Sequence, residues 1–190
     1  MSNFYIKQVS ATGSKVKPAI IEFTEGLNII HGISDTGKTC IQMCIDYLFG
    51  GDDLPFDKDV TGYSNAEMIV QTKDCEIRLS RPLGKNIINV VSTDDSFSGK
   101  YNAAYRKESK NPTIDSLFLR LIGIEEEITL IKNKNFTRYR LTWSIFSQMF
   151  LIKEDDVHKK GSILLPSRKE ANTLYCLYTG VKTLAFRRNL

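Results

Sequence analysis

Alternating hydrophobic and polar positions predict two antiparallel strand pairs in the first half of the chain. The first pair is separated by the polar, glycine-containing residues 12–17, which suit the turn of a hairpin. In the second pair, joined by Lys73-Asp74, apolar and polar residues alternate from Cys75 to Ser80, as in a strand with one face exposed. The expected strands, including a third beside the second pair, are residues 3–9, 19–23, 66–71, 75–80 and 87–91.

A strand, a glycine-containing loop and a helix are expected to follow one another after the first hairpin. The turn Glu25-Gly26 leads into Leu27–His31, a short apolar run typical of a buried strand. Beyond the loop that starts at Gly32, apolar residues recur at helical spacing until Gly50-Gly51 ends the pattern. The apolar positions of this helix are Ile41, Cys44, Ile45 and Leu48.

Two further helices are predicted from their start and stop signals. Asn111-Pro112 suits an N-cap followed by proline in the first turn, and an apolar stripe continues to Gly123. Ser167 and Glu170 form a capping box that opens a helix ending at Gly180. The stripe of the first of these helices consists of Ile114, Leu117, Phe118 and Leu121.

The remaining segments predict loops and two short elements. Residues 52–65 read as a surface loop, and residues 92–110, rich in Ser, Asp, Lys and Asn, as a long mobile loop. The apolar and aromatic stretch 139–152 divides into a short helix at 143–148 and a strand at 150–152.

Length and composition indicate one globular domain spanning residues 1–190. Hydrophobic residues make up 42% of the chain and charged residues 25%, and no stretch approaches the roughly 20 apolar residues that cross a bilayer. We therefore expect no membrane association, and the lack of a secretory signal pattern predicts a cytoplasmic location. The four cysteines form no CxxC pair, which argues against a zinc site or a disulfide framework.

The loop from Gly32 to Thr39 matches G-x-x-x-x-G-K-[ST], the phosphate-loop pattern, at every required position. Its glycines let successive backbone N–H groups wrap around phosphate oxygens, and the following helix points its positive end at them. Lys38 would neutralise the β and γ phosphates, and the Thr39 hydroxyl would hold Mg²⁺. We therefore expect ATP with Mg²⁺ at Gly32, Ser34, Asp35, Thr36, Gly37, Lys38, Thr39 and Cys40.

The first 50 residues resemble the N-terminal lobe of SMC-like ATPase heads. The residues that carry the resemblance are Leu27–Gly32, the loop itself and Ile45–Gly50. These heads belong to ABC-type ATPases with long coiled coils, which act in chromosome organisation, DNA repair and bacterial phage defence. The resemblance implies a mixed α/β fold of the P-loop NTPase class, in which an antiparallel hairpin sheet packs beside a P-loop strand and helix and the second lobe is incomplete.

A second similarity, over Leu141–Gly161, places "FLIKEDDV" where the family has its Q-loop. It makes Glu154, or Gln148 six residues earlier, the candidate that senses Mg²⁺ and the attacking water; a solvated acidic turn at residues 154–156 is the alternative. In this family the signature motif, the Walker B aspartate and the catalytic glutamate lie in a second lobe, and no LSGGQ-like stretch occurs here. The resemblance thus implies half of a head, with a second head or the missing C-terminal lobe as partner in a homo- or hetero-oligomer.

Two other functions remain open. A self-contained small P-loop NTPase or kinase would use residues 150–155 as a Walker B-like strand, although Lys153 interrupts the apolar run before Glu154. A nucleotide-binding module without hydrolysis would need no catalytic base at all.

DNA is a further candidate partner. The resemblance is what mainly implies it. The net charge is +4, and basic residues form three clusters, the first of which is interleaved with the aromatic residues Phe136 and Tyr139. A solvated basic face is the alternative explanation. The basic residues concerned are Lys132, Lys134, Arg138, Arg140, Lys159, Lys160, Arg187 and Arg188.

Overall fold

A computed structural model describes residues 4–33, 36–56, 62–105, 109–125, 128–131, 138–147 and 151–152. The chain divides into two compact units, residues 1–123 and residues 124–190. Among the described residues, no helix has the length and apolar character needed to span a membrane.

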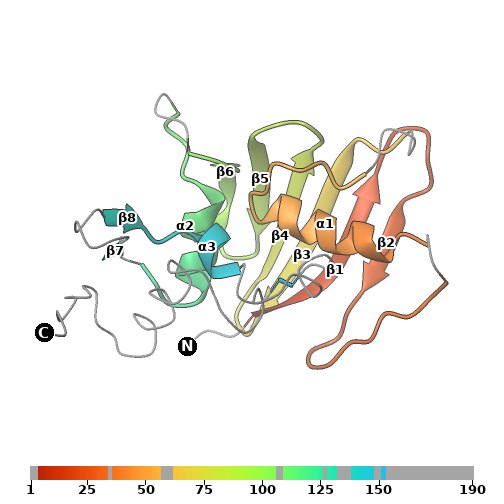
Figure 1. Cartoon of the computed structure of the whole chain (residues 1–190), viewed down its shortest axis with the longest axis horizontal. Coiled ribbons are helices and arrows are strands. Elements are labelled where there is room, and N and C mark those ends of the chain that lie inside the picture. The colour runs from red at the N-terminus through yellow and green to blue at the C-terminus, as the bar shows by residue number, and fades with distance from the viewer. Residues whose placement is uncertain are drawn as a thin grey trace, which may run out of the picture. The chain divides into compact units, whose positions relative to one another are not determined.

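The first unit is built on a six-stranded antiparallel sheet in the order β2-β1-β3-β4-β5-β6 (Figure 1). Strands that are consecutive in the sequence are neighbours in the sheet, except for β2 and β3. These two strands pair with opposite edges of β1, which therefore lies between them. The strands predicted from alternation are confirmed, each within a few residues at its ends. The bounds of the five predicted strands are Phe4–Thr12 (β1), Ala19–Glu22 (β2), Asn65–Thr72 (β3), Glu76–Pro82 (β4) and Ile87–Ser92 (β5). The sixth strand, Gly99–Asn102 (β6), was not predicted.

One face of this sheet is buried under two helices. On β3, buried and half-buried residues alternate without interruption along the strand, as expected for a sheet with one covered face. The predicted helices are confirmed as α1 (Lys38–Leu48), which lies over β1, β3 and β4, and α2 (Ile114–Leu121). On α2 the whole predicted apolar stripe is buried.

An aromatic cluster joins the two helices to the sheet. Phe118 of α2 lies edge-on to Phe49, the residue that follows α1, with ring centroids 4.7 Å apart. On its other side it meets Phe4 of β1 at 6.0 Å. The fully buried Phe118 therefore connects the C-terminal end of α1, the start of β1 and α2.

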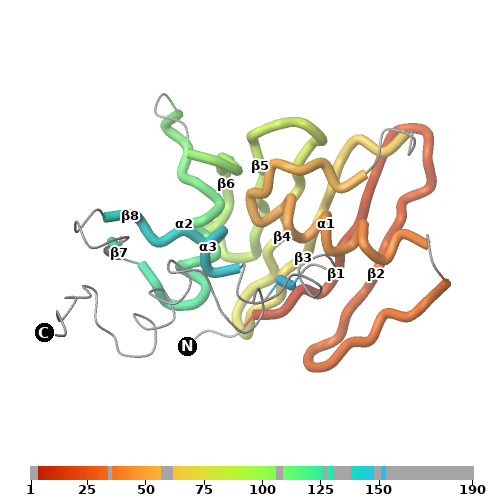
Figure 2. Tube along the Cα trace, in the orientation of Figure 1, coloured from red at the N-terminus to blue at the C-terminus, as the bar shows by residue number. Residues whose placement is uncertain are grey.

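The strand predicted at residues 27–31 is not formed. Residues 24–33, which follow β2, form an irregular, exposed segment outside the sheet (Figure 2). Asn28 shapes its start: the side-chain oxygen accepts from the Thr24 N–H at 3.0 Å, and the side-chain nitrogen donates to the Thr24 carbonyl at 2.7 Å. An apolar run becomes a strand only when a neighbouring strand pairs with it, and the described residues place none beside this one.

Two details of residues 92–113 also correct the sequence analysis. The expected loop at 92–110 contains a short 3-10 turn, Asp95–Phe97, and the edge strand β6. The N-cap of α2 is Thr113, not Asn111. The Pro112 carbonyl accepts a hydrogen bond from the Asn102 N–H at 2.8 Å, and Thr113 forms a bridge to Asn102, so this stretch stays extended against β6 before the helix can begin.

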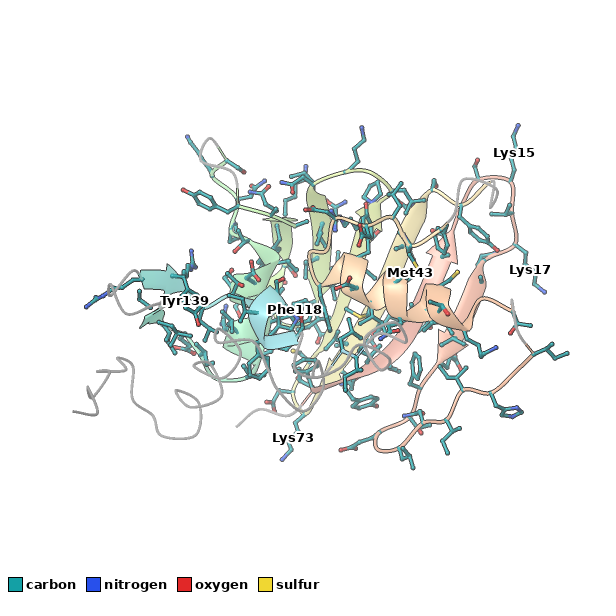
Figure 3. The ribbon with its side chains drawn as sticks, viewed as in Figure 1. Lys15, Lys17, Met43, Lys73, Phe118 and Tyr139 are labelled. Carbon is teal, nitrogen blue, oxygen red and sulfur yellow. The ribbon has the colours of Figure 1, made fainter. Side chains whose placement is uncertain are left out.

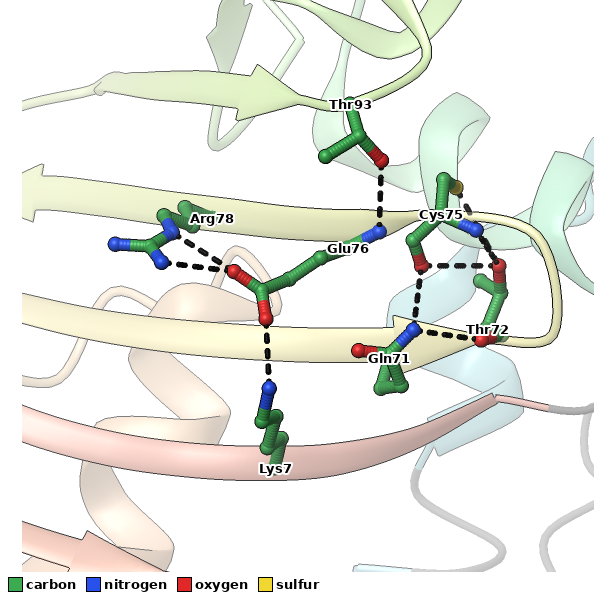
Figure 4. Close-up of polar contacts among 7 residues, drawn as sticks. All are labelled: Lys7, Gln71, Thr72, Cys75, Glu76, Arg78 and Thr93. Atoms are coloured by element: carbon green, nitrogen blue, oxygen red, sulfur yellow. Dashed lines mark hydrogen bonds and ion pairs between the residues drawn. The ribbon is translucent and has the colours of Figure 1, made fainter.

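Polar contacts fix the turn between β3 and β4 and the adjoining open face of the sheet (Figure 4). The Thr72 hydroxyl accepts from the Cys75 N–H at 2.9 Å and donates to the Cys75 carbonyl at 3.1 Å.

The Glu76 carboxylate forms ion pairs with Lys7 of β1 at 2.8 Å and with Arg78 at 2.9 Å. Hydrogen bonds from Lys7 and Arg78 lower the pKa of the Glu76 carboxyl group. The hydrogen bond to Glu76 in turn raises the pKa of Lys7.

The described part of the second unit consists of a two-stranded antiparallel pair and a short helix. They are β7 (Thr129–Ile131), β8 (Arg138–Arg140) and α3 (Trp143–Ser147). The helix predicted at 143–148 is confirmed through Ser147. Of the strand predicted at 150–152, Leu151 and Ile152 are not in a strand, and Phe150 lies outside the described residues, as does the predicted helix at 167–180.

Candidate functional site

The side chain of Lys38 lies across the loop that precedes α1. Its Nζ donates to the Gly32 carbonyl at 3.0 Å and to the Ile33 carbonyl, and it lies 3.4 Å from the Thr36 hydroxyl. The Thr36 hydroxyl in turn donates to the Ile33 carbonyl at 2.8 Å. These contacts hold Gly32 and Ile33 close to Thr36 and Lys38, so that the loop forms a closed turn. The Lys38 ammonium group that closes the turn carries a positive charge.

Two glycines permit this turn. Gly37 has φ of +81°, a left-handed conformation that L side chains rarely adopt. A Cβ on Gly32 would lie 3.1 Å from the Thr36 hydroxyl oxygen and 3.9 Å from Lys38 Cδ, so a side chain there would crowd the groups that close the loop. The backbone conformation thus favours glycine at position 37, whereas a side chain at position 32 would require the Thr36 hydroxyl to shift by a few tenths of an ångström.

The N-terminus of α1 is left open to an anion. Its N-cap is Gly37, which has no side chain to accept a hydrogen bond from the first turn, and that turn contains no acidic residue. The first N–H groups of a helix have no partner within the helix, and the helix dipole adds partial positive charge at this end. The exposed start of α1 therefore combines backbone donors, a dipole and the Lys38 ammonium, which together suit a phosphate group.

The other end of α1 is anchored in the core. Tyr47 and Leu48 are buried, and the Tyr47 hydroxyl donates to the Pro82 carbonyl of β4 at 2.9 Å. Cys44 is buried on the same face, and burial together with the nearby Cys40 thiol raises the pKa of Cys44 to about 12. Cys44 therefore stays a neutral thiol and acts as a small apolar side chain in the interface between α1 and the sheet.

The structure gathers most of the residues predicted for nucleotide binding. Gly32, Thr36, Gly37 and Lys38 form the closed turn, and Thr39 and Cys40 follow in the first turn of α1, with Thr39 exposed and Cys40 half-buried. The other predicted site residues lie outside the described residues, so their roles stay predictions: Ser34, Asp35, Gln148 and Glu154.

Of the predicted basic cluster, Arg138 and Arg140 are described. Both are exposed on β8 with Tyr139 between them. Lys132, Lys134 and Phe136, like residues 159–160 and 187–188, lie outside the described residues. In the first unit, Lys15 and Lys17 project outward from the hairpin that joins β1 to β2 (Figure 3).

Two features, one at the loop and one at the C-terminal end of α1, were not anticipated from the sequence. Large apolar side chains are exposed around the start of the loop: Leu27 is 87% exposed and Ile29 78% before Gly32, and Ile33 is 82% exposed directly after it. On the far side of α1, Arg81 is buried against the end of the helix. The second feature has a sequence signal, because Arg81 continues the inward-facing series Ile77, Leu79 along β4.

The chain matches a protein family described as an AAA domain over residues 12–188, and thus over most of both units. No curated protein and no solved structure matched the chain.

Proposed function

The chain belongs to the AAA domain family, whose members are nucleotide-binding, ATPase-like domains, and we propose that it binds Mg·ATP through the loop from Gly32 to Thr39. The observation that carries the proposal is the closed turn in which Lys38 Nζ is held by the Gly32 and Ile33 carbonyls beside the uncapped start of α1. The ammonium and the first N–H groups of α1 would bind the phosphates, and Thr39 would supply a hydroxyl ligand to Mg²⁺.

The exposed segment before the loop supports a narrower proposal, an SMC-like head lobe that is completed by a second lobe or subunit. Large apolar side chains are exposed to water along this strip, at Leu27 and Ile29 before the loop and at Ile33 within it, and a partner would cover them favourably. Their backbone also lies outside the sheet, free to pair with a strand. A partner that adds a strand here would cover the strip and fix the position of Gly32.

Calorimetry of the purified chain tests the Mg·ATP site, and an assay of ATP hydrolysis tests the need for a second lobe. Titration with Mg·ATP should give a measurable affinity that falls when Mg²⁺ is removed, because Thr39 would then lose the ion it binds. Hydrolysis by the chain alone should stay at background, since the proposed head needs groups from a second lobe. No heat with Mg·ATP would contradict the nucleotide site. Multiple turnovers by the chain alone would instead favour a self-contained NTPase.

We include DNA as a proposed partner of the second unit, on the evidence of the exposed pair Arg138 and Arg140 flanking Tyr139 on β8. If these arginines bind phosphates, the affinity for duplex DNA should fall steeply as salt rises, and Arg138→Ala with Arg140→Ala should flatten that dependence by roughly two units of log–log slope. Fluorescence anisotropy across a salt series measures this slope. An affinity that does not change with salt would rule out phosphate contacts, and Lys110→Ala, an exposed lysine of the first unit, is the control.

A further inference from the structure

Arg81 is a buried cation bound almost entirely by backbone oxygens. Only 4% of its surface is exposed. Its Nη1 donates to the Tyr47 carbonyl at 2.5 Å and to the Gly51 carbonyl at 2.7 Å, and its Nε donates to the Lys85 carbonyl at 2.8 Å. The guanidinium also stacks on the Tyr47 ring, 3.7 Å from its centroid.

Stability alone does not explain a charge at this position. Burial lowers the pKa of Arg81, while Tyr47 and Asp52 act in the opposite direction, so the charged group bears a desolvation cost that an apolar residue would avoid. The neighbouring inward positions of β4, Ile77 and Leu79, are apolar. An arginine at the next inward position therefore points to a role for the charge itself.

The three carbonyls show where the charge acts. The Tyr47 carbonyl belongs to the last turn of α1, at the negative end of the helix dipole, and it also accepts the Gly50 N–H at 3.1 Å; Gly51 follows the helix end. That last turn has no basic residue of its own. Arg81 provides the missing cation from β4, and the hydrogen bond from the Tyr47 hydroxyl to the Pro82 carbonyl joins the same two elements.

We propose that Arg81 is a positioning residue for the nucleotide site: it clamps the C-terminal end of α1 to β4 and thereby holds the N-terminal end of the helix, with Lys38 and Thr39, in the orientation that binds phosphate. This inference rests on the proposed Mg·ATP site. An anion at the positive, N-terminal end of α1 and a cation at its negative, C-terminal end both interact favourably with the helix dipole. The clamp also joins α1 to the turn that follows β4, through the Lys85 carbonyl.

The test compares nucleotide affinity with thermal stability in the full chain. Arg81→Met removes the charge and the hydrogen bonds but keeps much of the buried stem. We expect the Kd for Mg·ATP to rise roughly tenfold, because the helix loses both its terminal charge and its anchor. Arg81→Lys keeps the charge but cannot reach three carbonyls or stack as a plane, so it should recover part of the affinity.

A matched variant separates positioning from general destabilisation. Leu121→Ala, in the buried face of α2, should lower Tm by a comparable amount yet leave the Kd for Mg·ATP within about twofold of wild type at a temperature where each protein is folded. Hydrogen exchange of the α1 amides should speed up in Arg81→Met and much less in Leu121→Ala.

The outcomes distinguish this inference from the proposed site. If the wild-type chain does not bind Mg·ATP, the nucleotide site itself is wrong. If wild type binds and Arg81→Met binds equally well despite a lower Tm, Arg81 is a structural residue only and the positioning role is overturned. Should Arg81→Met fail to fold, the same decision is made on Arg81→Lys, for which an unchanged Kd and unchanged α1 exchange would overturn the role.

Discussion

Replacing Lys38 with alanine should weaken Mg·ATP binding at least about a hundredfold, the largest functional effect expected from one substitution. The ammonium makes two contributions. It is the positive charge placed to bind phosphate, and it holds the two ends of the loop together through the Gly32 and Ile33 carbonyls. Alanine removes both, so the loop would lose its charge and its closed shape in one step.

Isothermal titration measures this loss, and Lys73→Ala provides the matched control. Lys73 is exposed on the turn between β3 and β4 and projects away from the sheet (Figure 3), so its removal changes the net charge equally without touching the loop. Its affinity for Mg·ATP should match wild type. The Tm of Lys38→Ala should also stay close to wild type, because the Lys38 contacts lie at the surface. Equal affinities in Lys38→Ala and wild type would show that nucleotide binds elsewhere.

Local sequence patterns predicted those strands and helices in which the spacing of apolar residues alone shows which face is buried. The alternation through Ile77 and Leu79 fixed β4, and the helical spacing that includes Cys44 and Leu48 fixed α1, because one face of each is buried in the core. The positions of Gly32 and Gly37 likewise follow from the motif, since the loop closes through contacts only a few residues apart.

The errors arose where structure depends on a neighbour that is distant in the sequence. The apolar run at 27–31 has strand-like composition, but forming a strand requires a pairing partner, which the described residues do not place beside it. Conversely, β6 forms from a polar sequence because β5 offers it an edge, with Tyr101 opposite Ile88. Arg81 shows the same limit. The alternation along β4 predicts that its side chain faces the core, but it does not predict the contact with the C-terminal end of α1.

Replacing Phe118 with alanine should cause the largest loss of stability, about 3–5 kcal/mol. The ring is fully buried and contacts Phe49 beyond α1 and Phe4 on β1, so its removal leaves a cavity where three elements meet. Phe118→Leu, which refills much of that space, should cost distinctly less, whereas Val91→Ala, at a side chain 65% exposed on β5, should stay within about 0.5 kcal/mol of wild type.

Urea denaturation followed by far-ultraviolet circular dichroism is the suitable measurement for this series. The chain has one tryptophan, Trp143, which lies in the second unit, whereas circular dichroism follows the strands and helices of the first unit directly. A lower midpoint at constant slope would indicate lost packing, not a changed unfolded state. If Phe118→Ala were as stable as Val91→Ala, the aromatic cluster could not be what fixes the end of α1, and the attachment of the nucleotide loop to the sheet would then depend on Arg81 and on the buried face of α1, which includes Tyr47.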